Sequence, residues 1–249
     1  MTERENRKKN FDLLAMGELL LRLSPPGNDR ITRGDTFEKH IGGAELNVAA
    51  GVSLLGLRTG MISEIPDSAI GEFAKNKIRY LGVSDDYLVW DRDEDARLGV
   101  YYYESARYPR KPQVVYDRKH TSITKVDIDS FPEEMFSSTR CFHISGITLA
   151  LNEKARACGI EMIKRFKEHG ALISFDVNFR LNLWSGAEAK ACIEQILPYV
   201  DIFFCSEDTA RLTFLKEGTL QDIMREFTRE YPISIMASTQ RIVHSPKLH

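Results

Sequence analysis

Apolar residues follow two distinct patterns along the second half of the chain. Short, nearly continuous apolar runs predict buried strands at residues 141–146, 171–178, 201–207 and 233–240. Between these runs, apolar residues recur every three or four positions, which predicts helices over residues 152–170, 185–200, 208–214 and 220–231. Alternation of helices with continuously apolar strands is typical of a parallel sheet that is covered on both faces. The pattern therefore predicts an α/β fold.

The first half shows the same alternation less clearly. Helices are expected over residues 44–56 and 70–82, with a strand over residues 58–64 between them. Two further segments, at about 31–41 and 97–120, carry aromatic and basic residues on alternate positions. This period of two predicts short strands, which we expect to form a small antiparallel β lid across the main domain.

Composition and charge narrow the class of protein. The first ten residues are charged with both signs and are expected to form a disordered tail before a single domain over residues 11–249. The formal net charge is −2 with no basic stripe, which argues against a nucleic-acid partner. The apolar segment after the tail is interrupted by Asp12, Glu18 and Arg22, so it predicts neither a signal peptide nor a membrane helix. Four widely spaced cysteines indicate buried, reduced thiols, and we expect a cytoplasmic protein.

Polar residues follow the predicted strands. Ligands of open parallel sheets bind beyond the carboxyl ends of the strands, where loops and helix N-termini meet. The clearest group is Asp176, Asn178 and Arg180, because helix capping does not explain three such side chains at one strand end. An arginine in that place suits a carboxylate or a phosphate. Ser145 and Ser206 are explained equally well as helix caps.

A pair of adjacent glycines, Gly42 and Gly43, stands just before a predicted helix. Such a pair permits either an ordinary turn or a close approach of the backbone to a ligand. Asn47, in the first helical turn, either faces a hydroxylated ligand or bonds a nearby carbonyl group. His143, within an apolar run, is expected to be a hydrogen-bonded core residue rather than a catalytic base.

Tyrosine and arginine side chains share faces of two predicted lid strands. Tyr101 and Tyr103 lie on one face of the first strand, and Tyr116 and Arg118 share one face of the next. They form either an exposed sheet stabilised by cross-strand aromatic pairs, or a cover over the glycine pair that supplies hydroxyl groups and a cation.

Together these motifs resemble the ribokinase-like (PfkB-type) sugar kinases. The stretch GGAELNVAAGVSLLG, followed by TGMISEIPDSAIG, is similar to that family's first signature of paired glycines, asparagine and spaced glycines. Within the family, the stretches MGELLLRLSP, FHISGITLAL and SFDVNFRLNLW resemble the 2-keto-3-deoxygluconate kinases. The resemblance implies a doubly wound, mostly parallel sheet with a small β lid. It also implies phosphorylation of a sugar-acid hydroxyl group, with ATP and Mg²⁺ as cofactors.

The resemblance implies roles for particular residues. Substrate binding falls to Gly42, Gly43, Asn47, Tyr101, Tyr116, Arg118 and Arg180. The two arginines would hold the substrate carboxylate, which a neutral sugar such as fructose lacks. ATP binding falls to Asn178, Ser206, Ser238, Thr239 and Gln240. The family's N-x-x-E motif near the phosphates and magnesium appears here as residues 206–209, where Glu207 or Asp208 would have to replace the missing acidic residue.

The resemblance also leads to an expectation of low activity. The family's Gly-Ala-Gly-Asp type turn supplies amides for the transferring phosphate and an Asp for the hydroxyl proton, and it would lie beyond residue 249. We therefore expect a C-terminally incomplete domain that contains no catalytic residue and transfers phosphate at a negligible rate. A fructokinase-like enzyme and a non-catalytic sugar-acid-binding or regulatory protein are the alternatives. The expected partners are a sugar acid, a nucleotide and a second copy of the chain through the lid, without nucleic acid or membrane.

Overall fold

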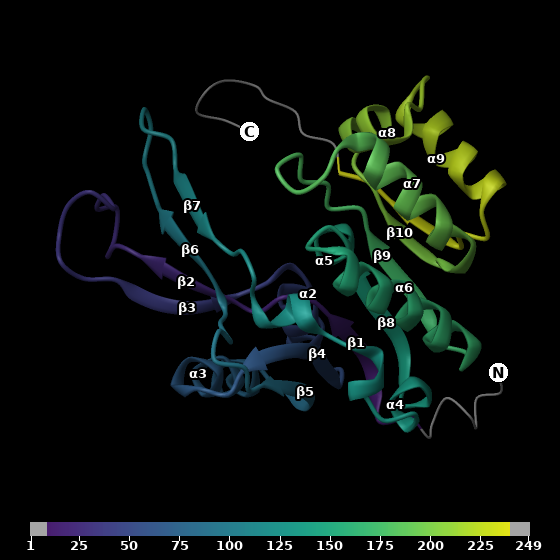
Figure 1. Ribbon diagram of the computed structural model, residues 1–249. Coiled ribbons are helices and arrows are strands. Elements are labelled where there is room, and N and C mark those ends of the chain that lie inside the picture. Colours follow the sequence, from purple (N-terminus) through teal and green to yellow (C-terminus); the bar gives the residue numbers. More distant parts are fainter. Residues whose placement is uncertain (1–8, 240–249) are drawn as a thin grey trace.

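The core of the protein is a seven-stranded parallel sheet (Figure 1). A computed structural model describes residues 9–239 of the chain. The strands lie in the order β11-β10-β9-β8-β1-β4-β5, and each neighbouring pair runs parallel. They are β1 (Phe11–Met16), β4 (Thr59–Pro66), β5 (Val83–Asp91), β8 (Thr139–Ser145), β9 (Leu172–Asp176), β10 (Ile202–Phe204) and β11 (Ile235–Ala237). This arrangement confirms the predicted α/β fold.

Helices pack on both faces of the core sheet. On one face α2 (Ala44–Leu54) and α3 (Ala69–Tyr80) pack against β1, β4 and β5, while Leu172, Phe204 and Ile235 of β9 to β11 are exposed. On the other face lie α6 (Glu153–Glu168), α7 (Gly186–Ile196), α8 (Glu207–Phe214) and α9 (Leu220–Glu230). The sequence of the central strand β1 is almost continuously apolar because both of its faces are buried. Leu13 and Ala15 are buried against α2 and α3, while Leu14 and Met16 are buried on the opposite face. The remaining helices are short: η1 (Ser122–Lys125), η2 (Ile128–Ser130), α4 (Glu134–Ser137), α5 (Gly146–Leu149) and η3 (Leu197–Tyr199).

Side-chain caps set the boundaries of the predicted helices. The Asn152 side chain accepts a hydrogen bond from the Ala155 amide at 2.8 Å at the start of α6, and Gly170, with φ of 74°, follows its end. Ser185 and Glu188 form a reciprocal capping box at the start of α7. Both helices therefore begin where the polar residues of the sequence predict.

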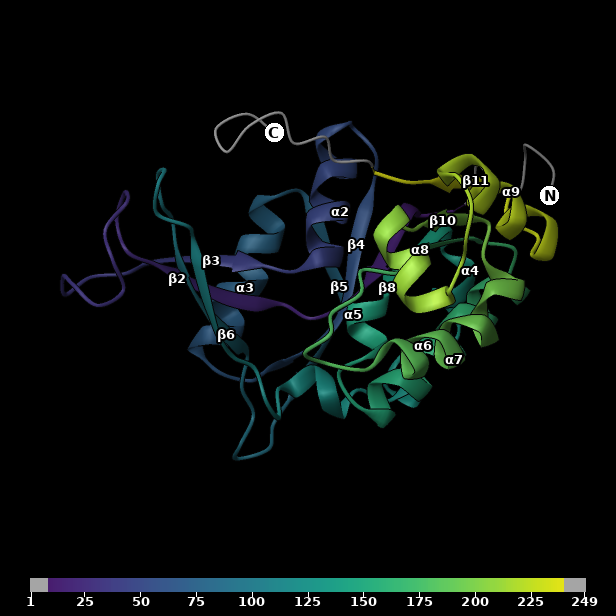
Figure 2. The ribbon, with the colours of Figure 1, turned by 90° about the horizontal axis from the view of Figure 1, so that it is seen from above.

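A second sheet of four strands extends from one side of the core (Figure 2), and we call it the lid. Its order is β3-β2-β6-β7, with bounds β2 (Leu20–Ser24), β3 (Glu38–Gly42), β6 (Gly99–Glu104) and β7 (Gln113–Asp117). The register places Tyr101 opposite Tyr116 on one face, and Tyr102 opposite Val115 on the other. The tyrosine run therefore alternates between faces as its period predicts.

The strands differ from the prediction at several points. Residues 31–37 form turns and bends, so β3 starts only at Glu38. β2 was not predicted as a separate strand, because residues 11–24 read as one apolar run although the chain leaves the core sheet after Met16. β2 also runs parallel to β6, so the lid is not purely antiparallel. β5 was not predicted either, since its acidic residues interrupt the apolar pattern.

Two further expectations concern the thiols and the membrane. All four cysteines are free, and three of them, Cys158, Cys192 and Cys205, are buried. Burial raises the pKa of Cys205 to about 12, so this thiol stays protonated at neutral pH. Within residues 9–239, none of the helices has both the length and the apolar composition needed to cross a membrane.

Candidate functional site

A cavity of about 230 Å³ lies between the lid and the core, and we call it the first cavity. Its lining includes six of the seven predicted substrate residues: Gly43, Asn47, Tyr101, Tyr116, Arg118 and Arg180. The lining also includes Glu18 and Glu45, which were not predicted, and Asn178, which was predicted for the nucleotide. Residues that are far apart in the sequence thus meet at one place, because the lid folds over the carboxyl end of the core sheet.

The paired glycines form the junction of lid and core beneath this cavity. A Cβ atom on Gly42 would lie 2.6 Å from the Tyr101 hydroxyl oxygen, and one on Gly43 would lie 2.5 Å from the Glu18 carbonyl oxygen. Neither distance is compatible with a side chain unless the neighbouring atoms move. At Gly43 a close approach of two backbone segments therefore requires glycine, whereas at Gly42 the neighbouring atom is the hydroxyl end of the Tyr101 side chain.

The lid presents an aromatic face to the first cavity. The ring centres of Tyr101 and Tyr116 lie 5.8 Å apart, and the guanidinium carbon of Arg118 lies 5.8 Å from the Tyr116 ring centre. Burial raises the pKa of Tyr101, so its hydroxyl group remains protonated and is available as a donor or an acceptor at neutral pH.

Arg118 is already paired with an acidic residue. Its guanidinium donates a hydrogen bond to Glu18 Oε2, while the Thr121 hydroxyl donates to Glu18 Oε1 at 2.8 Å. Burial raises the pKa of Glu18, and the Arg118 charge and the Thr121 hydrogen bond oppose that shift. The charge of Arg118 is therefore largely compensated within the cavity wall.

Arg180 stands in contrast on the core side of the cavity. Its side chain is exposed, and its guanidinium donates to the backbone oxygen of Phe179 at 3.0 Å. Arg180 forms no ion pair with any carboxylate in the part of the chain that the structure describes. It is consequently the guanidinium of the first cavity that is available to an anion from solution.

The segment that carries Arg180 lies against the end of β8. A Cβ atom on Gly146 would lie 2.2 Å from the Val177 carbonyl oxygen, so only glycine allows the two strand ends to approach so closely. Asn178 follows with a left-handed φ of 37°, and its backbone amide donates a hydrogen bond to Asp176 Oδ1 at 3.0 Å. Burial raises the pKa of Asp176, whereas this hydrogen bond and the Arg180 charge oppose the shift.

A second cavity, of about 350 Å³, adjoins the first. Asn178 and Arg180 line both cavities, so they form the wall that the two share. Four of the five predicted ATP residues, Asn178, Ser206, Ser238 and Thr239, line the second cavity. Gln240 lies outside the described residues. The Ser238 hydroxyl is buried and has no hydrogen-bond partner among residues 9–239.

Ser206 also caps α8, which was the alternative explanation for this residue. Its hydroxyl oxygen accepts a hydrogen bond from the Thr209 amide at 3.2 Å, and its hydroxyl group lies 2.8 Å from Thr209 Oγ1. Ser145, in contrast, makes no side-chain cap and donates to Glu45 at 2.6 Å. His143 is a buried core residue as expected, with Nδ1 2.9 Å from Ser174 Oγ, and burial lowers its pKa to about 4.

Three acidic residues in or near the second cavity are candidates for holding a divalent cation. Glu207 is held by Arg211 at 2.7 Å, and neither Glu207 nor Asp208 lines the cavity. Asp176 does line it, and Mg²⁺ in kinases is commonly bound by one or two carboxylates together with substrate phosphates. The described residues contain no cluster of three or more His, Cys, Asp or Glu side chains that could hold a metal ion.

Glu18 and Glu45 are the main lining residues that sequence reasoning missed. Glu18 follows the first strand, so an inspection of every strand end would have found it. Glu45 carries no such signal, because an acidic residue in a first helical turn is common. Its carboxylate is fully buried and accepts hydrogen bonds from Ser145 Oγ at 2.6 Å and Thr148 Oγ1 at 2.7 Å. It thereby ties the start of α2 to the end of β8.

Comparisons with known proteins place this geometry in a family. The family model described as "pfkB family carbohydrate kinase" matches residues 10–228. The chain is 33% identical over 229 residues to the 2-dehydro-3-deoxygalactonokinase of Haloferax volcanii, covering 92% of this chain and 71% of the relative. It spans from 52% to 71% of the lengths of eight curated relatives.

Solved structures that superpose on this chain are also sugar kinases. The crystal structure of the 2-dehydro-3-deoxygluconokinase of Thermotoga maritima superposes with a TM-score of 0.85 at 32% identity, covering 91% of this chain and 71% of that one. An uncharacterized sugar kinase of Pyrococcus horikoshii, solved in complex with ATP, superposes with a TM-score of 0.71 at 26% identity. The match covers 82% of this chain and 66% of the Pyrococcus horikoshii chain.

Proposed function

The chain belongs to the pfkB family of carbohydrate kinases, and we propose that it binds a 2-dehydro-3-deoxy sugar acid in the first cavity and ATP in the second. The observation that carries this proposal is the unpaired guanidinium of Arg180 in the wall of the first cavity. A carboxylate would form an ion pair with it, whereas a neutral sugar would offer it uncharged acceptors only. The names of the relatives above, a galactono- and a gluconokinase of this substrate class, support the same ligand.

The two arginines contribute differently to this binding. Arg118 is paired with Glu18, so it adds hydrogen-bond donors but little net charge. Arg180 supplies the positive charge that selects an acid. Asn47 and Tyr101 border the same cavity and offer an amide and a hydroxyl group to the sugar hydroxyls. Gly43 keeps that part of the cavity free of a side chain.

The shared wall supports a phosphoryl transfer from the second cavity to the first. Asn178 and Arg180 border both cavities, so a nucleotide phosphate and a sugar hydroxyl would meet beside them. Such transfers depend mainly on positioning and on compensation of charge. Mg²⁺, when bound with the nucleotide, neutralises phosphate charge, and Asp176 is the carboxylate of this chain that would hold it.

The 249 residues themselves contain no Gly-Ala-Gly-Asp sequence. A general base and an anion site each contribute about 100-fold or more to group transfer in enzymes that use them. We therefore propose that these 249 residues alone bind the sugar acid but transfer phosphate at a negligible rate. Saturable, ATP-dependent turnover of 2-dehydro-3-deoxygluconate by the purified chain would contradict this.

Calorimetric titration tests the substrate class. The chain should bind 2-dehydro-3-deoxygluconate and should not bind fructose at the same concentrations. Arg180→Met should weaken binding of the acid about 10- to 100-fold, because a hydrogen bond to a charged group is worth about 1.5–3 kcal/mol. Arg92→Met is the matched control, since Arg92 pairs with Asp67 on the surface and lines neither cavity. Equal affinity of the Arg180 variant and the unaltered chain would refute the role of Arg180.

The face of the lid that points away from the first cavity carries exposed apolar side chains that could contact a second copy of the chain. Phe37 and Tyr102 form an edge contact there with ring centres 5.8 Å apart, and Val115 is 53% exposed beside them. We expect two copies of the chain to pair through this face in the cytoplasm. Light scattering should then give a dimer for the unaltered chain and a monomer for Val115→Glu, whereas a monomer in both cases would exclude this pairing.

A further inference from the structure

The chain crosses four times between the core and the lid. In chain order, the first crossing enters the lid between β1 and β2, and the second returns between β3 and α2. The third enters the lid between β5 and β6, and the fourth returns between β7 and η1. Any movement of the lid relative to the core must act on these four segments. A residue that contacts all of them, through its backbone and its side chain, would therefore control the position of the lid.

Glu18 touches every one of these crossings. It lies in the first crossing itself, and its carbonyl oxygen would be 2.5 Å from a Cβ on Gly43 in the second. Its Oε1 atom would be 2.9 Å from a Cβ on Gly99, where the third crossing enters β6. In the fourth crossing, Arg118 donates to Oε2 and Thr121 donates to Oε1 at 2.8 Å.

The surroundings of Glu18 leave its carboxylate little freedom. Its side chain is 3% exposed, and that of Arg118 is 13% exposed. A buried carboxylate is costly unless it is paired and hydrogen-bonded, so this pair holds together the segments that carry it. The same pairing fixes the Arg118 guanidinium in the wall of the first cavity, over the Tyr116 ring.

We propose that Glu18 is a positioning residue: its carboxylate ties the first, third and fourth crossings together beside the close backbone contact that Glu18 makes with the second, and it holds the Arg118 guanidinium in place for the sugar acid. The hinge part depends only on the fold, and the Arg118 part rests on the proposed function. Glu18 acts on the ligand through Arg118 and through the lid, and it takes no chemical step itself.

Amide hydrogen exchange of the sugar-free chain tests the hinge. Glu18→Gln keeps the shape of the side chain but removes its charge, and it replaces one of the two accepting oxygens with an NH2 donor. Exchange in β6 and β7 should become at least fivefold faster, while β8 and β9 of the core should exchange as before. Unchanged exchange in β6 and β7 would overturn the hinge. Should Glu18→Gln not fold, Thr121→Val, which deletes one hydrogen bond to the same carboxylate, replaces it.

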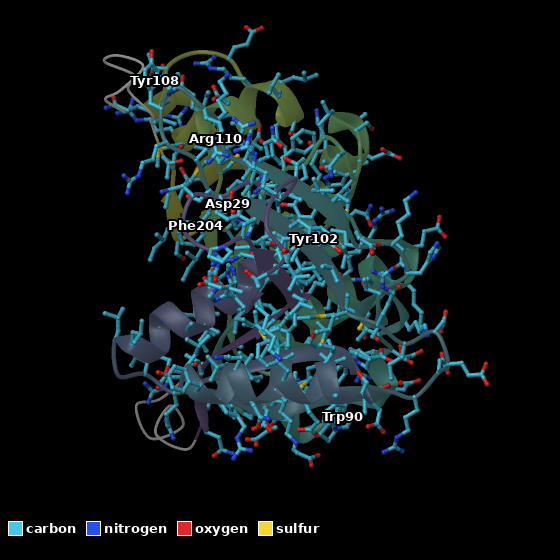
Figure 3. The ribbon with its side chains drawn as sticks, turned by 90° about the vertical axis from the view of Figure 1, so that its left-hand side faces the viewer. Asp29, Trp90, Tyr102, Tyr108, Arg110 and Phe204 are labelled. Carbon is cyan, nitrogen blue, oxygen red and sulfur yellow. The ribbon has the colours of Figure 1, made fainter. Side chains whose placement is uncertain are left out.

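A second buried pair in the lid provides a matched control. Glu104 is 4% exposed and binds Arg110 at 2.7 Å, but it lies at the far end of β6 from the hinge. Figure 3 shows Arg110 and Tyr108 toward the tip of the lid, on the turn that follows β6. Glu104→Gln should speed exchange only around residues 28–31 and 105–110, and should change sugar-acid affinity less than twofold. Loosening of the hinge by this variant would mean that any buried lid carboxylate has the same effect.

A double-mutant cycle tests the action through Arg118. Glu18→Gln should weaken binding of 2-dehydro-3-deoxygluconate about tenfold in the unaltered chain. In an Arg118→Met background, the same substitution should have an effect at least fivefold smaller, because its target is gone. Equal losses in both backgrounds, or tighter binding by Glu18→Gln, would refute the positioning of Arg118. If the unaltered chain binds no sugar acid at all, the proposed function fails, while the exchange experiment still decides the hinge.

Discussion

Two glycines lie close together in the sequence, one just before α2 and one within it, and only the first has no room for a side chain. Gly43 precedes α2 and lies so close to the Glu18 carbonyl that no side chain fits, whereas Gly51, within α2, has no atom within 4 Å of a Cβ position. The first glycine is therefore needed for a close backbone approach, and the second only adds flexibility to a helix.

Alanine substitutions should separate these two glycines. Gly43→Ala forces backbone atoms apart and should lower the free energy of unfolding by about 1–3 kcal/mol. Gly51→Ala should raise it by about 0.5–1 kcal/mol, since alanine loses less entropy in a helix. Urea denaturation measures both. A stabilised Gly43→Ala variant would show that the core and lid do not approach as described.

His143 makes a pH-dependent contribution to stability. Burial lowers its pKa from 6.5 to about 4 in the folded chain, so the unfolded chain takes up a proton first as the pH falls. Stability should thus be complete above pH 6.5 and be lost between pH 6.5 and 4, by about 3 kcal/mol. The difference in unfolding free energy between the unaltered chain and His143→Gln separates the contribution of His143 from that of the carboxylates that titrate over the same pH range. A difference that does not change over that range would contradict the burial of His143.

At the scale of elements, the helices were easier to predict than the lid. α6 and α7 have apolar residues at helical spacing and polar caps at their starts, so local chemistry alone sets their limits. β2 lies in the same apolar run as β1, and only the tertiary path of the chain assigns it to a different sheet. Edge and lid strands of this kind carry no local signal that names their partner.

The cap of α8 connects an element to the second cavity. Ser206→Ala should cost about 1 kcal/mol of stability, because the Thr209 amide loses its acceptor. Ser185→Ala removes a comparable cap from α7, outside both cavities, and should cost a similar amount. In ATP titrations only Ser206→Ala should weaken binding, by about fivefold, as expected for one hydrogen bond. An equal effect of both variants on ATP affinity would leave Ser206 as a cap alone.

At the scale of the molecule, the site arises from the way the lid folds over the core. Strand-end rules pointed to Arg180 and Asn178 because such residues lie at the carboxyl edge of a parallel sheet. They could not reveal that Glu18 compensates the charge of Arg118, since that pair joins residues 100 positions apart. The two arginines were therefore predicted as equal partners of a carboxylate, and the structure distinguishes them by their pairing.

The most direct measurement is a crystal structure of the 249-residue chain with 2-dehydro-3-deoxygluconate bound. We expect the sugar in the first cavity between Gly43 and Tyr101, with its carboxylate about 2.7–2.9 Å from the Arg180 guanidinium. Glu18 should remain bound to Arg118 in that complex. A carboxylate that faces solvent, or a sugar bound outside the first cavity, would contradict the assignment of a sugar-acid site to this chain.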